Sequence, residues 1–199
     1  MAQLLRWRRD VRHFDAAPLP DGALDPLLAS ADCAPSVGNS RPWRFVRVVS
    51  PGLRADLADH VDAEVARTGR NYPPDQEAQY RSLKLHGLRE APEILAVFCD
   101  RMAAAGHGLG RATMPETLDY SVVLAVHTLW LAAKARGIGL GWVSIVDPLF
   151  VHARLGAAAE WKTIALLCLG YPQSASDLPE LHRAGWQANT DWQARVSVC

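Results

Sequence analysis

Two short apolar runs stand out along the chain, Ile94–Cys99 and the run within Lys162–Leu169. A run of this length is typical of a strand that is buried on both faces. Apolar residues also gather over Trp43–Val49 and at the end of a glycine-rich segment that leads to Ile145. We therefore predict four strands, with the two continuous runs as the buried ones.

Most of the remaining chain is predicted as helix, from apolar spacing of three to four residues and from prolines and capping residues at the ends. The predicted helices are Leu4–Val11, Asp21–Ala34, Leu53–Thr68, Glu77–Leu88, Pro115–Arg136 and Pro148–Leu155. Along the chain, the predicted helices and strands do not alternate regularly, so the predicted fold class is α+β. A chain of 199 residues can bury one core but hardly two, which predicts a single domain over 1–199.

The predicted helix Pro115–Arg136 carries apolar residues on nearly all of its sides. A helix of this kind is buried all round. Because one small domain cannot easily cover every side of it, we expect a second copy of the chain to cover the rest. The sequence thus predicts a homodimer.

Charge and composition exclude several classes of function. Lys plus Arg and Asp plus Glu both number 21, so no net charge attracts nucleic acid or an anionic membrane. No apolar stretch approaches the roughly 20 residues that cross a bilayer, and the first residues lack the layout of a signal peptide. The four cysteines form no C-x-x-C pair and the histidines no H-E-x-x-H motif. We expect a cytoplasmic protein without disulfides or a metal site.

Three arginines surround one aspartate near the start of the chain, in the order Arg8, Arg9, Asp10 and Arg12. On a helix, Arg8 and Arg12 would share one face, where their guanidinium groups could fork onto a phosphate. The alternative is a solvated basic patch in which Asp10 is only an ion-pair partner.

The loop Ala34–Trp43 combines turn-forming residues with residues that could bind a ligand. Gly38 and Asn39 accept a left-handed backbone, and the side chains of Ser36 and Asn39 could meet the polar edge of a flat heterocycle. The alternative is a loop that only ends one helix and starts a strand.

Two glycine-rich stretches, Gly106–Gly110 and Gly137–Gly141, invite comparison with a dinucleotide site. The first has Arg111 where G-x-G-x-x-G needs its third glycine, and the second runs from helix into strand, the reverse of the required order. We therefore predict no Rossmann site. The second stretch could let a flat ligand approach the backbone beside Trp142 and Ser144, or it could serve packing alone.

The motifs described above occur in the order found in the nitroreductase-like flavoproteins, which the chain resembles up to about Trp186. The shared pattern is R-R-x-x-R near the start, A-P-S-x-x-N-x-x-P-W, a G-x-G-x-x strand after a long apolar helix, and a closing L-G-Y-P. Finer features resemble one branch, the 5,6-dimethylbenzimidazole synthases known as BluB. They lie in Arg8–Arg12, Pro35–Gly38, Tyr80–Leu85, Leu109–Ser121, Gly141–Ile145 and Pro179–Trp186.

The resemblance implies a nitroreductase-like fold, with a mixed central sheet flanked by helices and an FMN at a dimer interface. It implies that the arginine segment lies near the phosphate, the Pro35 loop beside the ring, and the backbone of residues 142–145 near the reactive edge of the ring. The FMN-binding residues implied in this way are Arg8, Arg9, Asp10, Val11, Arg12, Pro35, Ser36, Asn39, Leu85, Trp142, Ser144 and Ile145. Asp10 and Ser144 are the implied catalytic residues, and residues 75–113 the implied lid.

The activity that the resemblance implies is oxygen-dependent fragmentation of reduced FMN. The products are 5,6-dimethylbenzimidazole, which is the lower ligand of vitamin B12, and a four-carbon sugar phosphate. FMN is then a substrate, O2 a co-substrate, and a separate NAD(P)H flavin reductase supplies the electrons. Because reduced flavin reacts with O2 unaided, the protein has to control protons and exclude water. The alternatives are a conventional NAD(P)H-dependent FMN nitroreductase and, from another class, a non-catalytic flavin-binding dimer.

The chain departs from the pattern of this branch in three places. Arg41 stands where relatives usually have Gln before Pro-Trp, and Asn39 is the residue common to ordinary nitroreductases. The tail Gln187–Cys199 lacks the basic R-x-P-L-type segment that usually helps to bind the flavin phosphate.

Overall fold

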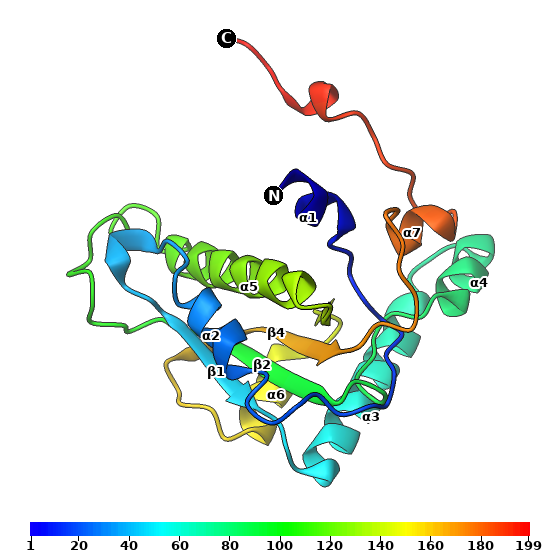
Figure 1. Cartoon of the computed structure of the whole chain (residues 1–199), viewed down its shortest axis with the longest axis horizontal. Coiled ribbons are helices and arrows are strands. Elements are labelled where there is room, and N and C mark those ends of the chain that lie inside the picture. Colours follow the sequence, from blue (N-terminus) through cyan, green and yellow to red (C-terminus); the bar gives the residue numbers. More distant parts are fainter.

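The centre of the fold is a four-stranded sheet with the strand order β1-β2-β4-β3 (Figure 1). The computed structural model describes all residues from 1 to 199. The strands are β1 (Trp43–Arg47), β2 (Glu93–Asp100), β3 (Gly139–Val143) and β4 (Trp161–Gly170). The helices are α1 (Ala2–Trp7), α2 (Asp25–Ala31), η1 (Val37–Asn39), α3 (Pro51–Gly69), α4 (Pro74–Ser82), α5 (Thr117–Ala135), α6 (Pro148–Arg154), α7 (Glu180–Arg183) and η2 (Trp192–Arg195). The α+β class predicted from the apolar pattern is confirmed.

Strands β2 and β4 are buried on both faces, as their apolar runs predict. Successive side chains of a strand point to opposite sides, so Leu95 and Val97 join one core cluster while Ala96 and Phe98 join the other. The first cluster includes side chains of α2 and α5, and the second includes side chains of α3 and α6. The sheet is thus the middle layer between two layers of helices.

The N-terminal segment is extended where the sequence predicted a helix. Helix α1 ends at Trp7 and does not continue to Val11, because Asp10 forms an isolated parallel bridge with Leu140 of β3. The Val11 N–H donates to the Leu140 carbonyl at 3.1 Å. All neighbouring pairs among the four strands are antiparallel, so the mixed sheet that the resemblance implied is wrong, and parallel pairing is confined to this isolated bridge. Arg8 therefore shares no helical face with the other arginines.

Helix α4 ends at Ser82, although the sequence predicted helix as far as Leu88. The backbone becomes extended at Leu83, and the carbonyl of Lys84 accepts a hydrogen bond from Arg12 at 3.0 Å. This contact with the N-terminal segment uses a carbonyl that a continued helix would need for its own ladder. Tertiary contact here overrides local propensity.

The implied lid, residues 75–113, contains strand β2 between β1 and β4. The six central residues of β2 are buried, so this strand cannot move as part of a lid. The parts of the range outside the sheet are α4 with the segment after it and the turn-rich loop 101–113.

Helix α5 is buried on one side only within a single chain. Its buried residues face the sheet and α2. On the opposite side, Tyr120, Val123 and Leu124 are 53%, 44% and 45% exposed. The expected burial on all sides is therefore not achieved by one chain, which leaves an apolar face open for a partner.

None of the helices combines the length and the apolar character that crossing a membrane requires. Beyond α7, residues 187–199 are exposed and run away from the rest of the molecule (Figure 1).

Candidate active site

The N-terminal segment crosses strand β3 at two glycines. The side chain of Val11 lies against Gly139, where an added Cβ would come within 2.9 Å of Val11 Cγ2. The carbonyl oxygen of Val11 lies against Gly141, where an added Cβ would collide with it. The close backbone approach at this glycine pattern is thus made by the chain itself, which supports the packing interpretation.

This crossing places the carboxylate of Asp10 against the backbone of β3. Its Oδ1 accepts a hydrogen bond from the Trp142 N–H at 2.9 Å, and its Oδ2 accepts one from Arg12 Nε at 3.0 Å. Arg12 is itself held by the Lys84 carbonyl. The side chain of Asp10 nevertheless remains 32% exposed, and it lines a hollow of about 150 Å³.

Burial raises the pKa of the Asp10 carboxyl above its ordinary value, although the Trp142 hydrogen bond and the charge of Arg12 oppose the shift. A carboxyl with a raised pKa that still lines a hollow is a candidate for proton transfer. An Asp10 that served only as an ion pair for Arg12 would not need the additional bond to the Trp142 backbone.

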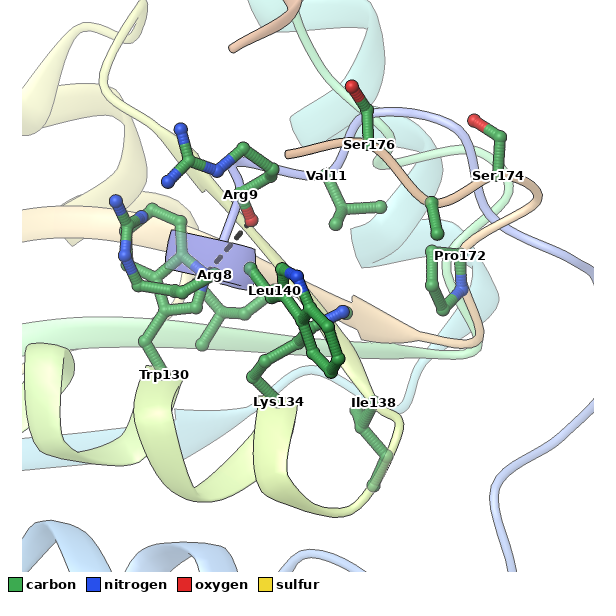
Figure 2. A pocket seen from close by; sticks show the side chains of 13 residues that line it. Arg8, Arg9, Val11, Trp130, Lys134, Ile138, Leu140, Pro172, Ser174 and Ser176 are labelled. Atoms are coloured by element: carbon green, nitrogen blue, oxygen red, sulfur yellow. Dashed lines mark hydrogen bonds between the residues drawn. The ribbon is translucent and has the colours of Figure 1, made fainter. Parts of the chain in front are cut away.

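Arg8 and Arg9 line a second hollow and form no ion pair (Figure 2). The guanidinium of Arg8 lies over the Trp130 ring, 4.7 Å from its centroid, and Arg9 donates to the Arg6 carbonyl at 2.8 Å. Burial and the charge of Arg9 lower the pKa of Arg8, and the Nε of Arg9 is buried without a hydrogen-bond partner. This positive charge, which no ion pair neutralises, is suited to bind an anion. The guanidinium of Arg12, by contrast, is already bonded to Asp10 and Lys84.

Residues after β4 enclose the arginine segment from the other side. Ser174 and Ser176 line the hollows, and Glu180 Oε1 accepts a hydrogen bond from His13 Nε2 at 3.0 Å. Trp130, Glu180 and Arg183 line these hollows and were missed as site residues in the sequence, because only the fold brings them to the arginines. No group of three or more His, Cys, Asp or Glu side chains is placed to hold a metal ion.

The loop with Pro35, Ser36 and Asn39 lies at the other end of α5. The Val37 N–H donates to Ser121 Oγ near the start of that helix at 3.0 Å, whereas the arginine segment contacts Trp130. Nine helical residues separate these two anchor points, which corresponds to roughly 14 Å along the axis. Within one chain the two predicted parts of the site therefore lie at opposite ends of α5.

Two departures from the branch pattern have a structural role in this loop. Asn39 and Arg41 both adopt a positive φ, of 55° and 44°. The side chain of Arg41 pairs with Asp32 at 3.0 Å, and the other oxygen of Asp32 accepts from Trp43 Nε1 at 3.1 Å. Arg41 thus helps to fix the turn between α2 and β1.

Ser144 and Ile145 follow directly on the last residue of β3, so neither belongs to the strand that was predicted to include them. Ser144 is exposed and its hydroxyl bonds to no protein group, while Ile145 is half-buried. Leu85 is also half-buried and follows Lys84, whose carbonyl holds Arg12. The structure thus brings Asp10, the end of β3 and the Leu85 segment together.

Comparison with known proteins identifies the family of the chain. The sequence pattern of the Nitroreductase family matches residues 5–171. A 5,6-dimethylbenzimidazole synthase of Rhodobacter capsulatus is 51% identical over 197 residues, which are 98% of this chain and 95% of the relative. A protein of the same name from Rhodospirillum rubrum is 54% identical over 185 residues, which are 93% of this chain and 88% of the relative.

Solved structures share the fold. An iodotyrosine deiodinase bound to FMN and 3-iodo-L-tyrosine superposes with a TM-score of 0.74 at 25% identity, over 88% of this chain and 91% of that one. A nitroreductase family protein of Clostridium difficile superposes with a TM-score of 0.72 at 18% identity, over 99% and 96% of the two chains. The chain therefore belongs to the nitroreductase family, in the branch whose members are named 5,6-dimethylbenzimidazole synthase.

Proposed function

We propose that this protein fragments reduced FMN in the presence of O2 and forms 5,6-dimethylbenzimidazole and a four-carbon sugar phosphate. Relatives at about half identity over nearly the whole chain carry the corresponding name. The observation that carries the proposal in this chain is Asp10, a carboxyl with a raised pKa between the arginine segment and the end of β3.

The residues that line the hollow in Figure 2 are chemically suited to the phosphate of FMN. Three cations, Arg8, Arg9 and Lys134, line it together with the hydroxyl-bearing Ser174 and Ser176, and no carboxylate residue does. The guanidinium of Arg8 donates to no protein group and the Nε of Arg9 has no partner, so both arginines keep N–H groups that suit a dianion. We assign the phosphate to Arg8 and Arg9 and give Arg12 the task of holding Asp10.

We propose that a second copy of the chain completes the ring part of the site. Pro35, Ser36 and Asn39 lie at one end of α5 and the arginine segment at the other. A two-fold axis that packs the open apolar faces of two α5 helices together would bring this loop of the partner subunit towards the arginines. We therefore propose a homodimer with two equivalent FMN sites.

In this site the chain contributes binding and proton control, while reduced FMN supplies the electrons that O2 accepts. Asp10, held by Trp142 and Arg12, exchanges a proton with the flavin's ribityl chain. The free hydroxyl of Ser144 hydrogen-bonds at the reactive edge of the ring. Leu85 and Ile145 help to exclude water. A separate NAD(P)H flavin reductase provides the reduced FMN.

The test is product analysis. The protein is incubated with FMN, NADH, a separate flavin reductase and air, and the mixture is separated by chromatography and identified by mass spectrometry. FMN should disappear and 5,6-dimethylbenzimidazole should accumulate, whereas controls under nitrogen or without this protein should form none. Intact FMN after many cycles of reduction and reoxidation would refute fragmentation. Rapid bleaching of bound FMN by NADPH alone would instead support a conventional nitroreductase.

A further inference from the structure

One side chain of α5 contacts both arginines of the phosphate hollow. The ring of Trp130 lies under the guanidinium of Arg8 at 4.7 Å, and its Nε1–H donates to the backbone carbonyl of Arg9 at 3.2 Å. Figure 2 shows all three residues on the same side of the hollow, with Lys134 one helical turn further along α5. The indole thus connects the extended N-terminal segment to the helix that packs on the sheet.

Two neighbouring arginines need a force that keeps them in place. Their charges repel, and this repulsion together with burial lowers the pKa of Arg8. A carboxylate could hold the guanidinium, but it would occupy the N–H groups that a phosphate has to reach. The face of an indole attracts the cation through its ring electrons and leaves the N–H edge free.

We propose that Trp130 is a positioning residue for phosphate recognition, which holds Arg8 by its ring face and Arg9 by its Nε1–H. The inference rests on the proposed FMN site and adds to it the residue that organises the arginines before the ligand binds. The Trp130 contact with Arg9 joins residues 121 positions apart, so it also fixes the segment that carries Asp10. Preorganisation of this kind lowers the entropic cost of binding.

The test compares the affinities of FMN and riboflavin, which differ only in the phosphate, by flavin fluorescence without any reductase. Trp130→Leu removes both contacts and should weaken FMN binding about 10-fold or more, while riboflavin binding should change less than about 2-fold. Trp130→Phe keeps a ring under Arg8 but loses the Nε1–H, so its loss for FMN should be smaller. This second variant also keeps the experiment decisive if the leucine variant does not fold.

A matched control lies elsewhere in the chain. Trp161 of β4 has Arg44 over its ring at 6.0 Å, in a region that does not line the arginine hollows. Trp161→Leu should leave the ratio of the FMN and riboflavin affinities unchanged.

The outcomes separate the inference from the function on which it rests. If wild-type protein prefers FMN to riboflavin but Trp130→Leu weakens both equally, or neither, Trp130 has no role in phosphate recognition and the inference is overturned alone. If wild-type protein binds both flavins equally, the assignment of the phosphate to Arg8 and Arg9 is wrong and the inference about Trp130 falls with it, while fragmentation is decided separately by the product analysis.

Discussion

The carboxylate of Asp10 is hydrogen-bonded to Trp142 and Arg12, but its negative charge is unfavourable where it is buried. Burial raises the pKa of its carboxyl above the ordinary 3.8, so folding favours the protonated form. The stability that this residue contributes is present at low pH and is lost as the pH rises through the raised pKa. At neutral pH the ionised carboxylate therefore costs stability, as is common for residues that are kept for chemistry.

The raised pKa of Asp10 predicts a measurable dependence of stability on pH. The free energy of unfolding of Asp10→Asn, relative to wild type, should increase as the pH is raised from below 3.8 to 7, because Asn does not ionise. Urea denaturation of both proteins across this range measures the difference. A difference that moves in favour of wild type over the same range would mean that the folded state prefers the ionised carboxylate.

The same substitution separates chemistry from positioning. The Asn side chain can still accept the Trp142 N–H, so Asp10→Asn should bind FMN nearly as wild type does, yet form almost no 5,6-dimethylbenzimidazole. Flavin titration and product analysis give the two quantities. If the variant instead lost mainly affinity, Asp10 would act by orienting Arg12.

Ser144 has no hydrogen-bond partner in the protein, so its hydroxyl is available to a ligand. Ser144→Ala should keep the fold and most of the FMN affinity, because the backbone at the end of β3 is unchanged. Product formation should fall by about 100-fold, a typical size for the loss of one catalytic hydrogen bond. Wild-type turnover in this variant would make the hydroxyl dispensable.

At the scale of the elements, strand β3 and the N-terminal segment depend on glycine. An added Cβ at Gly141 would collide with the carbonyl of Val11, which is backbone and cannot rotate away. Gly141→Ala should therefore destabilise the fold by about 3 kcal/mol and displace Asp10 from Trp142. Thermal unfolding measures the first effect and FMN binding the second.

Gly52 in the first turn of α3 provides the control for this substitution. An added Cβ there would meet only Ser50 Oγ, at 3.8 Å. Gly52→Ala should be neutral or slightly stabilising, since alanine is the better helix former. Equal stability of the two alanine variants would mean that β3 can shift to admit a side chain.

For the whole molecule, the open face of α5 predicts the assembly. Leu124 is 45% exposed on the side of α5 that faces away from the sheet. Leu124→Glu should place a charge in the proposed interface, convert the dimer into a monomer of 21.8 kDa, and weaken FMN binding by removing the partner's loop. Light scattering during gel filtration gives the mass, and flavin titration gives the affinity.

A second exposed leucine tests whether the effect is local. Leu149 of α6 is 78% exposed on a different layer of the fold. Leu149→Glu should leave both the mass and the FMN affinity unchanged. A wild-type protein that is a monomer at micromolar concentration with FMN present would contradict the proposed interface directly.

Much of the fold was predictable because it depends on local patterns. The runs at Ile94–Cys99 and Lys162–Leu169 became the two strands buried on both faces, since an unbroken apolar sequence can be stable only between two layers. The errors lie where distant segments compete with local propensity. Helix was predicted for residues 8–11 and 83–88, but neither stretch is helical, and both contact other parts of the fold.

The sequence by itself determined the fold class, the membership in the nitroreductase family and the residue types available for FMN, because these follow from periodicity and from the order of motifs. Only the tertiary structure decided which of these residues lie together. Asp10 meets Trp142 across 132 residues, Trp130 lies under Arg8, and the Pro35 loop lies at the opposite end of α5 from the arginines. The physical reason is that close contacts between distant segments depend on how the layers pack, and on two glycines that let one backbone cross another.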